Sequence, residues 1–250
     1  MTTKFFLRTI APLIILSLWV MVSQMKLVNP LLLPSPADVF EITREMLFTG
    51  NIFPDILASL YRLTVCLSAA IIFGIPLGLL IGYFEKAYLA LEFPIEFLRS
   101  VPSAALASLF IILFGIGDKS VIALGFLASF LVIIVNTSYG VFHGNKLRRK
   151  VAKSMGATGV KFFVKIIFPE SLPYIFVGIR IAISIALVIV IFTEMLLGAQ
   201  GGIGNRLIHA QLVFNTKELY ALIILIGTIG YLINKIFLSF EKRVVHWAGK

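Results

Sequence analysis

Long apolar runs, interrupted by short charged segments, constrain this chain more than any other feature of its sequence. Hydrophobic residues fill 59% of the 250 positions and charged residues only 14%, and the mean hydropathy is +1.01. A helix needs roughly 20 apolar residues to cross a bilayer, and several runs reach that length. The sequence therefore predicts an all-α membrane protein whose single transmembrane domain covers residues 1–250 and contacts lipid.

Six transmembrane helices are predicted from these runs. Their approximate boundaries are 9–25, 56–83, 97–116, 120–142, 172–197 and 219–239. The first run follows Lys4 and Arg8 and resembles the apolar part of a signal peptide. The sequence after it, Ser23-Gln24-Met25-Lys26, lacks a cleavage site with two small residues, so we expect an uncleaved span.

The 22 lysine and arginine residues are spread unevenly over the segments between these spans. If the N-terminus is cytoplasmic, most of them fall in the inner segments, as the positive-inside rule requires. We therefore expect a multi-pass protein of the cell (inner or plasma) membrane with both termini cytoplasmic. The net charge of +10 belongs to these loops, which argues against nucleic acid as a partner.

The inner segment 143–171 is too long and too patterned for a simple connection between two spans. Residues Leu147 to Met155 predict a short basic helix, with Gly156 as its C-terminal cap. Residues Val160 to Phe168 predict a second helix that Pro169 stops. The segment would then form an elbow of two helices in the cytoplasm; a basic patch that contacts anionic headgroups is the alternative.

The first outer segment contains the start of another helix. Ser35 would be its N-cap, Pro36 its first helical residue, and Asp38 would complete the capping box. Two interpretations stay open for this helix: it lies on the outer membrane surface, or it is a packed connector. In the second span, Gly74, Gly78 and Gly82 recur every four residues and predict a close contact with another helix.

Polar side chains inside a span need a partner, a watery cavity or a route to the interface. We take five of them as candidate pathway or gate residues: Arg62, Ser103, Asn136, Arg180 and Glu194. For Arg62 we favour a structural contact near the outer interface, with contact to a substrate anion as the alternative. Ser103 follows Pro102, where a broken helix would begin, so residues 99–103 are a candidate gate.

Arg180 and Glu194 are fourteen residues apart in the fifth span, so they project from nearly the same side of the helix but about 21 Å apart along it. They cannot pair with each other. For both residues, lining of the pathway and pairing with another helix or a second subunit stay equally open. Asn136 is more often a contact between helices than a ligand at such a position.

A resemblance to a known family rests on the inner segment. The run Lys150-Val151-Ala152-Lys153-Ser154-Met155-Gly156-Ala157, followed by Phe168-Pro169-Glu170-Ser171-Leu172-Pro173, resembles the cytoplasmic signature loop of the permeases of ATP-binding-cassette (ABC) importers. Six further motifs over about residues 30–245 resemble the subgroup that imports nitrate, sulfonates and taurine. They are Leu33-Pro34-Ser35-Pro36, Gly74-Ile75-Pro76-Leu77-Gly78, Leu98-Arg99-Ser100-Val101-Pro102, Phe114-Gly115-Ile116-Gly117, Gly178-Ile179-Arg180 and Gly201-Gly202-Ile203-Gly204.

The resemblance implies a type I ABC importer permease fold with six transmembrane helices and a cytoplasmic coupling helix at residues 150–157. It also implies three partners: an ABC ATPase dimer, an extracytoplasmic substrate-binding protein and a second copy of this chain. ATP and Mg²⁺ would bind to the ATPase, because this chain has no glycine-rich phosphate loop. The family signature usually opens with Glu-Ala-Ala, whereas Lys150 here replaces the acid with a base, which leaves the details of docking open.

Two other function classes fit the sequence less well. An ion-coupled secondary transporter would favour several acidic residues at mid-membrane, and only Glu194 is available, near one edge. An intramembrane enzyme would need clustered nucleophiles, bases or metal ligands, but the three histidines lie outside or at the ends of spans, and Cys66 is the only cysteine. We expect no catalytic residue, metal site or cofactor in this chain. The solute, whether nitrate, a sulfonate, taurine or a vitamin precursor, stays open.

Overall fold

The computed structural model describes residues 2–197 and 201–246, and the other positions of the predicted domain 1–250 lie outside the described residues. The regular structure of the described residues is helical. In chain order, the elements are α1 (Thr2–Gln24), α2 (Pro36–Phe48), α3 (Phe53–Tyr83), α4 (Glu85–Ser100), α5 (Ser103–Phe114), α6 (Asp118–Phe142), α7 (Lys146–Ser154), α8 (Gly159–Phe162), the π-helical turn η1 (Phe163–Ile167), α9 (Phe168–Leu197), α10 (Ile203–Leu212) and α11 (Thr216–Val244).

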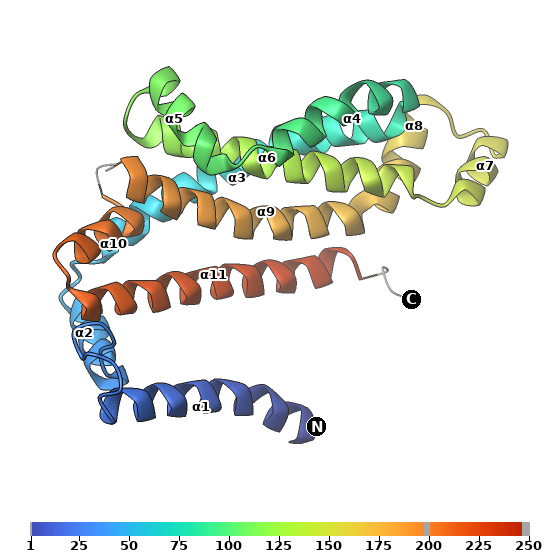
Figure 1. Ribbon diagram of the computed structural model, residues 1–250. Helices are drawn as coiled ribbons and strands as arrows, with labels where there is room; N and C mark the ends of the chain where they lie inside the picture. Colours follow the sequence, from blue (N-terminus) through green and yellow to red (C-terminus); the bar gives the residue numbers. More distant parts are fainter. Residues whose placement is uncertain (1, 198–200, 247–250) are drawn as a thin grey trace.

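The long helices α3, α6 and α9 form the centre of the molecule, with α11 beside α9 and α1 at the edge (Figure 1). The glycines of α3 allow its close contact with α6. A Cβ atom at Gly78 would lie 2.7 Å from the Cβ of Thr137, and one at Gly82 would lie 2.6 Å from the carbonyl oxygen of Ser138. This contact confirms the prediction from the four-residue spacing of these glycines.

Four helices of the described residues are long and apolar enough to cross a membrane: α3, α6, α11 and the continuous helix Gly159–Leu197. Counting a bent pair, α4 with α5, gives five. The apolar part of α1, Ile10–Gln24, falls below the length of a span, although the sequence predicts a span at 9–25. The predicted number of six spans is therefore not reproduced by length and composition.

The predicted span 97–116 is wrong as a single helix. Helix α4 begins at Glu85, and α4 and α5 are bent by 100° at the break between them. Val101, at the break, has an extended conformation (φ −75°, ψ 123°). Pro102 causes this, because a proline disfavours the helical conformation of the residue before it and has no N–H to donate.

The basic helix α7 ends as predicted. Gly156 has a φ of +82°, and its N–H donates to the carbonyl oxygen of Lys153 at 3.0 Å. The N–H of Ala157 donates to the carbonyl oxygen of Ala152, also at 3.0 Å. These two bonds form a Schellman motif, in which a left-handed glycine terminates a helix.

Pro169 does not stop the second helix of this segment, and that prediction is wrong. The helix continues from α8 through η1 into α9. Within η1 the N–H of Phe168 donates to the carbonyl oxygen of Phe163, five residues earlier. A proline clashes with the carbonyl four residues before it, and the wider π-helical turn just before Pro169 relieves this clash.

Helix α2 is a packed connector. Ser35 accepts the N–H of Asp38 and Pro36 is the first helical residue, as predicted. The inward side chains of α2, Val39 and Met46, are 1% and 5% exposed and belong to one cluster with residues of α10 and α11. This burial favours the connector over a helix that lies on the membrane surface.

The bundle has two distinct ends (Figure 1). Helix α1 begins and α11 ends at the end that carries α7, which we call the α7 end. Helices α2 and α10 lie at the opposite end, which we call the α10 end. The start of α1, the end of α11 and α7 therefore lie at the same end of the bundle. That both termini and the coupling segment face the cytoplasm stays a prediction.

Candidate functional site

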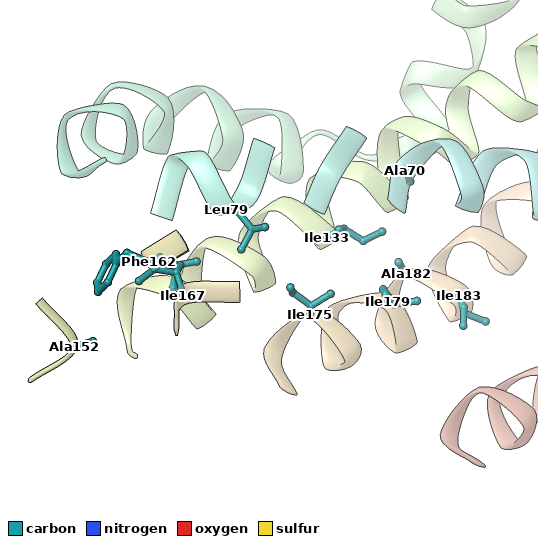
Figure 2. Packing of buried hydrophobic residues seen from close by; sticks show 11 residues of the cluster. Ala70, Leu79, Ile133, Ala152, Phe162, Ile167, Ile175, Ile179, Ala182 and Ile183 are labelled. Atoms are coloured by element: carbon teal, nitrogen blue, oxygen red, sulfur yellow. The ribbon is translucent and has the colours of Figure 1, made fainter. Parts of the chain in front are cut away.

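The candidate coupling segment is anchored in the core of the bundle. Ala152 of α7, Phe162 of α8 and Ile167 of η1 are 9%, 3% and 0% exposed. They belong to the same buried cluster as Ile175 of α9 and Leu79 of α3 (Figure 2). Because packed side chains transmit displacement, a partner that moves α7 also moves the helices behind it.

A carboxylate holds the start of α7 against α9. Glu170, in the first turn of α9, accepts the N–H of Asn145 at 2.6 Å and Nε of Arg149 at 2.9 Å. Asn145 is also the N-cap of α7, since its side chain accepts the N–H of Arg148 at 3.0 Å. Glu170 lies within the motif Phe168 to Pro173 but has no role predicted from the sequence; an isolated acid beside so basic a segment is the signal that points to it.

The predicted coupling residues Lys150 to Ala157 lie together on α7 and its terminal elbow. Lys153 extends over the ring of Phe162, with its Nζ 5.5 Å from the ring centre. Leu147, Val151 and Met155 lie on one side of α7 at intervals of four residues, and all three are exposed. Helix α7 thus packs Ala152 into the core and exposes an apolar row whose middle residue, Val151, lies about 100° around the helix from Ala152.

Two buried charges pair at the α10 end. Arg62 of α3 is 1% exposed, and its Nη1 lies 2.6 Å from Oε1 of Glu194, on α9, which is 0% exposed. Nη2 of Arg62 lies 2.7 Å from Oδ1 of Asp118, at the start of α6. Nη1 also donates to the carbonyl oxygen of Gly201 at 3.0 Å. A buried arginine with two carboxylates has the partners that such a charge requires.

The chain after α9 folds onto this pair. The N–H of Gly204 donates to Oε2 of Glu194, and the N–H of Ile203 donates to Oγ of Ser59, both at 2.9 Å. Ser59 Oγ in turn lies 2.8 Å from Oε2 of Glu194. A Cβ atom at Gly202, whose φ is +108°, would lie 2.6 Å from Glu194. The approach therefore requires glycine at position 202.

Arg206 of α10 extends this polar cluster and is not among the site residues predicted from the sequence. Its Nε lies 2.6 Å from Oε1 of Glu218 on α11, and its Nη1 lies 3.5 Å from Oδ2 of Asp55 on α3. Arg206 follows the glycine motif and is followed twelve residues later by an acid, which is the available sequence signal. Its pairs tie α10 to both neighbouring helices.

The remaining candidates lie apart from this cluster. Arg180 pairs with Glu241 of α11, in agreement with the expectation that it cannot pair with Glu194. The side-chain amide of Asn136 donates to the carbonyl oxygen of Val132 at 2.9 Å. Asn136 also contacts α9 at Gly178, since a Cβ atom added to this glycine would lie 2.7 Å from the Cβ of Asn136. This geometry favours a contact between helices. The structure thus brings together Arg62 and Glu194 alone among the five candidates.

The break between α4 and α5 opens a cavity of about 210 Å³. Arg99 and Ser103, one on each side of the break, line it together with Leu131 of α6 and Ile185 of α9. Such a break is tolerated where the backbone lines a cavity. The gate role of residues 99–103 stays a prediction. In residues 2–197 and 201–246, no group of three His, Cys, Asp or Glu side chains could hold a metal ion.

Curated relatives and a family model match this chain. The family model described as "Binding-protein-dependent transport system inner membrane component" matches residues 74–248. A probable ABC transporter permease protein of Brucella melitensis biotype 1 is 33% identical over 215 residues, which are 86% of this chain and 87% of the relative.

Two further relatives have named solutes. The taurine transport system permease protein of Escherichia coli K12 is 30% identical over 242 residues, covering 95% of this chain and 88% of the relative. The nitrate import permease protein of a Synechocystis species is 32% identical over 222 residues, covering 85% of this chain and 80% of the relative.

The fold is similar to that of a solved ABC importer. An inward-facing structure of the MetNI methionine ABC transporter matches with a TM-score of 0.68 at 17% identity, covering 79% of this chain and 97% of the matched chain. The chain has the type I ABC importer permease fold. It belongs to the family of binding-protein-dependent transport system inner membrane components, and it is a membrane-embedded permease subunit of an ABC importer rather than an enzyme.

Proposed function

We propose that two copies of this chain form the pathway of an importer whose ABC ATPase dimer docks on α7 and binds ATP and Mg²⁺. The observation that carries the proposal is that α7 has a buried and an exposed surface. Ala152 packs in the core, while Leu147, Val151 and Met155 are exposed and free to contact a partner. Closure of the ATPase dimer would displace α7, α8 and α9 together. Such a rigid-body change can switch a pathway between its two states.

The ATPase would bind the apolar row of α7. Leu147, Val151 and Met155 are 71%, 51% and 82% exposed at the α7 end of the bundle, and exposed apolar rows mark interaction surfaces. Lys150 lies beside this row and is also exposed. A groove with an apolar floor and acidic rim on the ATPase would match this helix, which is the role we assign to the base at position 150.

The extracytoplasmic binding protein would dock at the α10 end. Leu212, Val213 and Phe214 are exposed in sequence after α10, and Phe214 has a left-handed backbone with a φ of +55°. A bulky residue in that conformation is uncommon and is held by surrounding structure. An exposed apolar turn of this kind, at the end of α10, is suited to contact with a partner that delivers solute.

The transported solute is proposed to be a small oxyanion or zwitterion, such as taurine, another sulfonate or nitrate. This proposal is supported by the solutes named for the relatives from E. coli and Synechocystis. A vitamin precursor remains the other class within the family resemblance. The binding protein would select among these solutes before they reach the permease.

The experiment that tests the proposal uses a tagged chain co-expressed with its neighbouring genes. Native mass measurement should give two copies of this chain with two ATPase subunits. In proteoliposomes, the complex should take up taurine, methanesulfonate or nitrate only with ATP and the binding protein. Uptake by the permease chain alone under an ion gradient would instead establish the alternative, an ion-coupled secondary transporter.

A further inference from the structure

A groove of about 590 Å³ runs between α9 and α11 in the half of the bundle nearer the α7 end. Its polar lining comes from Arg180 and Ser184 on α9 and from Asn234 and Lys235 on α11. Isoleucine, leucine and tyrosine side chains line the rest. The groove therefore combines cationic groups with apolar walls.

The positive charges of the groove outnumber the carboxylates that face them. Arg180 pairs with one carboxylate, that of Glu241, and its buried Nε has no hydrogen-bond partner in the described part of the chain. The Nζ of Lys235 lies 5.7 Å from the ring centre of Tyr231, and no ion pair of Lys235 with an acid occurs among the described residues. A side chain that carries an uncompensated charge at membrane depth calls for a counter-ion.

The chemistry of these groups selects the ligand. Arginine and lysine carry only donors, and the amide of Asn234 already donates to Oγ of Ser184 at 3.2 Å. The side chain of Arg180 is 39% exposed, and Lys235 is exposed as well, so both charged groups are open to a ligand in the groove. A group with several acceptor oxygens and a negative charge satisfies both side chains at once.

We propose that the groove between α9 and α11 binds one oxyanion between Arg180 and Lys235. Two sources share this chemistry, namely the phosphate of an anionic phospholipid and a small solute with a sulfonate or phosphate group. A lipid would also place its acyl chains along the apolar walls. The lipid source is independent of the function proposed above; the solute source rests on that function and would make the groove a step of the pathway.

The test measures binding to the full-length chain without ATP, ATPase or binding protein, so that it does not depend on transport. For the lipid source, nanodiscs of phosphatidylcholine with one-tenth phosphatidylglycerol are used, and native mass spectrometry counts the phosphatidylglycerol retained per chain. For the solute source, nanodiscs of phosphatidylcholine alone are titrated calorimetrically with methanesulfonate and with inorganic phosphate. The variants are Lys235→Gln and the double change Arg180→Gln with Glu241→Gln, which leaves no unpaired carboxylate.

Lys242→Gln is the matched control, because it removes one positive charge from the last turn of the same helix without lining the groove. We expect one anion per chain, bound about fivefold more weakly after Lys235→Gln, because the change removes one exposed charge that contacts the anion. Binding should scarcely change after Lys242→Gln, because that side chain does not line the groove. Retention of phosphatidylglycerol alone identifies a lipid site, and binding of methanesulfonate or phosphate alone identifies a solute site. Equal weakening by Lys235→Gln and Lys242→Gln, or binding of neither probe, would overturn the proposal.

Discussion

Arg62 and Glu194 show how a charge is kept inside an apolar helix bundle. Each is at most 1% exposed, and together they engage Ser59, Asp118 and the backbone of residues 201–204. Buried ion pairs are seldom strongly stabilising in themselves, but the loss of one partner is costly. The arrangement favours the structural interpretation of Arg62, whose side chain holds the segment after α9 against α3.

Glu194→Gln should lower the stability of the bundle more than any loss of a surface ion pair. The change removes the buried carboxylate but leaves Asp118 as a charged partner of Arg62, so we expect a cost below the about 3–5 kcal/mol of a buried charge left with no partner. Thermal unfolding of the detergent-solubilised chain measures the effect. Arg99→Gln is the control, because its pair with Glu96 is exposed and worth about 0–1 kcal/mol. Equal unfolding temperatures for the two variants would contradict a role of the buried pair in stability.

Gly156 tests the backbone requirement of the coupling elbow. A Cβ atom at this position would contact nothing within 4 Å, so Gly156→Ala introduces only the strain of a left-handed φ. That strain is about 1–2 kcal/mol, which shifts the population of the elbow roughly five- to thirtyfold. ATP-driven uptake should fall accordingly.

Gly156→Asn is the matched variant, because asparagine adopts the left-handed region more readily than alanine. It should recover most of the uptake that Gly156→Ala loses. If both variants lost the same uptake, the side chain rather than the backbone conformation would be the cause, and a contact surface at position 156 would replace the elbow as the explanation.

At the scale of elements, Glu170 makes α7 and α9 one unit. Glu170→Gln weakens two hydrogen bonds of a carboxylate that is 8% exposed, and bonds of this kind contribute about 1.5–3 kcal/mol. Amide hydrogen exchange in α7 should accelerate by about tenfold or more, while α3 stays protected. Glu45→Gln, at the other end of the molecule, is the control. Unchanged exchange in α7 would show that the core contact of Ala152 suffices to hold the helix.

Helix α2 should show a dependence on pH at its start. Two hydrogen bonds lower the pKa of Asp38 below its ordinary value: the one from Ser35 has the larger effect, and the one from Lys217 has the next largest. A lowered folded-state pKa means that the ionised form stabilises the fold. Its contribution is complete above the unfolded-state pKa of about 4 and is lost as the pH falls through the lower folded-state value. The protection of the amides in the first turn of α2 against hydrogen exchange, taken relative to the intrinsic rate at each pH, should decrease below about pH 4, and Asp38→Asn should remove this dependence.

Local signals in the sequence predict helix ends, but they do not predict which residues far apart in the sequence form pairs. The caps at Ser35 and Gly156 follow from a few neighbouring residues, so both are predicted correctly. The pairing of Arg62 with Glu194 joins residues 132 positions apart, and the packing of α3 against α9 decides it. A proline rule alone also misplaces an end, because the π-helical turn before Pro169 accommodates the proline and lets the helix continue from α8 into α9.

The segment between α3 and α6 shows that a search for apolar runs does not locate every helix. The charges at the start of α4 conceal its helix from a search for apolar runs, and the apolar run that remains crosses the break at Pro102. The sequence does indicate a helix start at Ser103, since the preceding proline is visible. The 100° bend and the cavity that α4 and α5 form with α6 and α9 involve residues far apart in the sequence, which no local pattern encodes.

At the scale of the whole molecule, the two ends of the bundle should face opposite sides of the membrane. Met155 at the α7 end and Phe214 at the α10 end are 82% and 79% exposed, so a cysteine introduced at either position can react with a maleimide. The native Cys66 is 0% exposed and can stay in place. An impermeant maleimide should label Phe214→Cys in right-side-out spheroplasts and Met155→Cys only in inverted vesicles, because the basic loops of the α7 end favour the cytoplasm.

The same two variants connect orientation to assembly. When the ATPase is added to inverted vesicles, labelling of Met155→Cys should decrease severalfold, because its side chain belongs to the apolar row that we assign to the ATPase, while Phe214→Cys stays unaffected. Val160→Cys is the control, since Val160 is 79% exposed beyond the elbow and lies outside that row. Equal protection of positions 155 and 160 would indicate a wider contact, and protection of neither would move the docking surface away from α7. Labelling of Met155→Cys from the outside would reverse the orientation and place the binding protein, rather than the ATPase, at the α7 end.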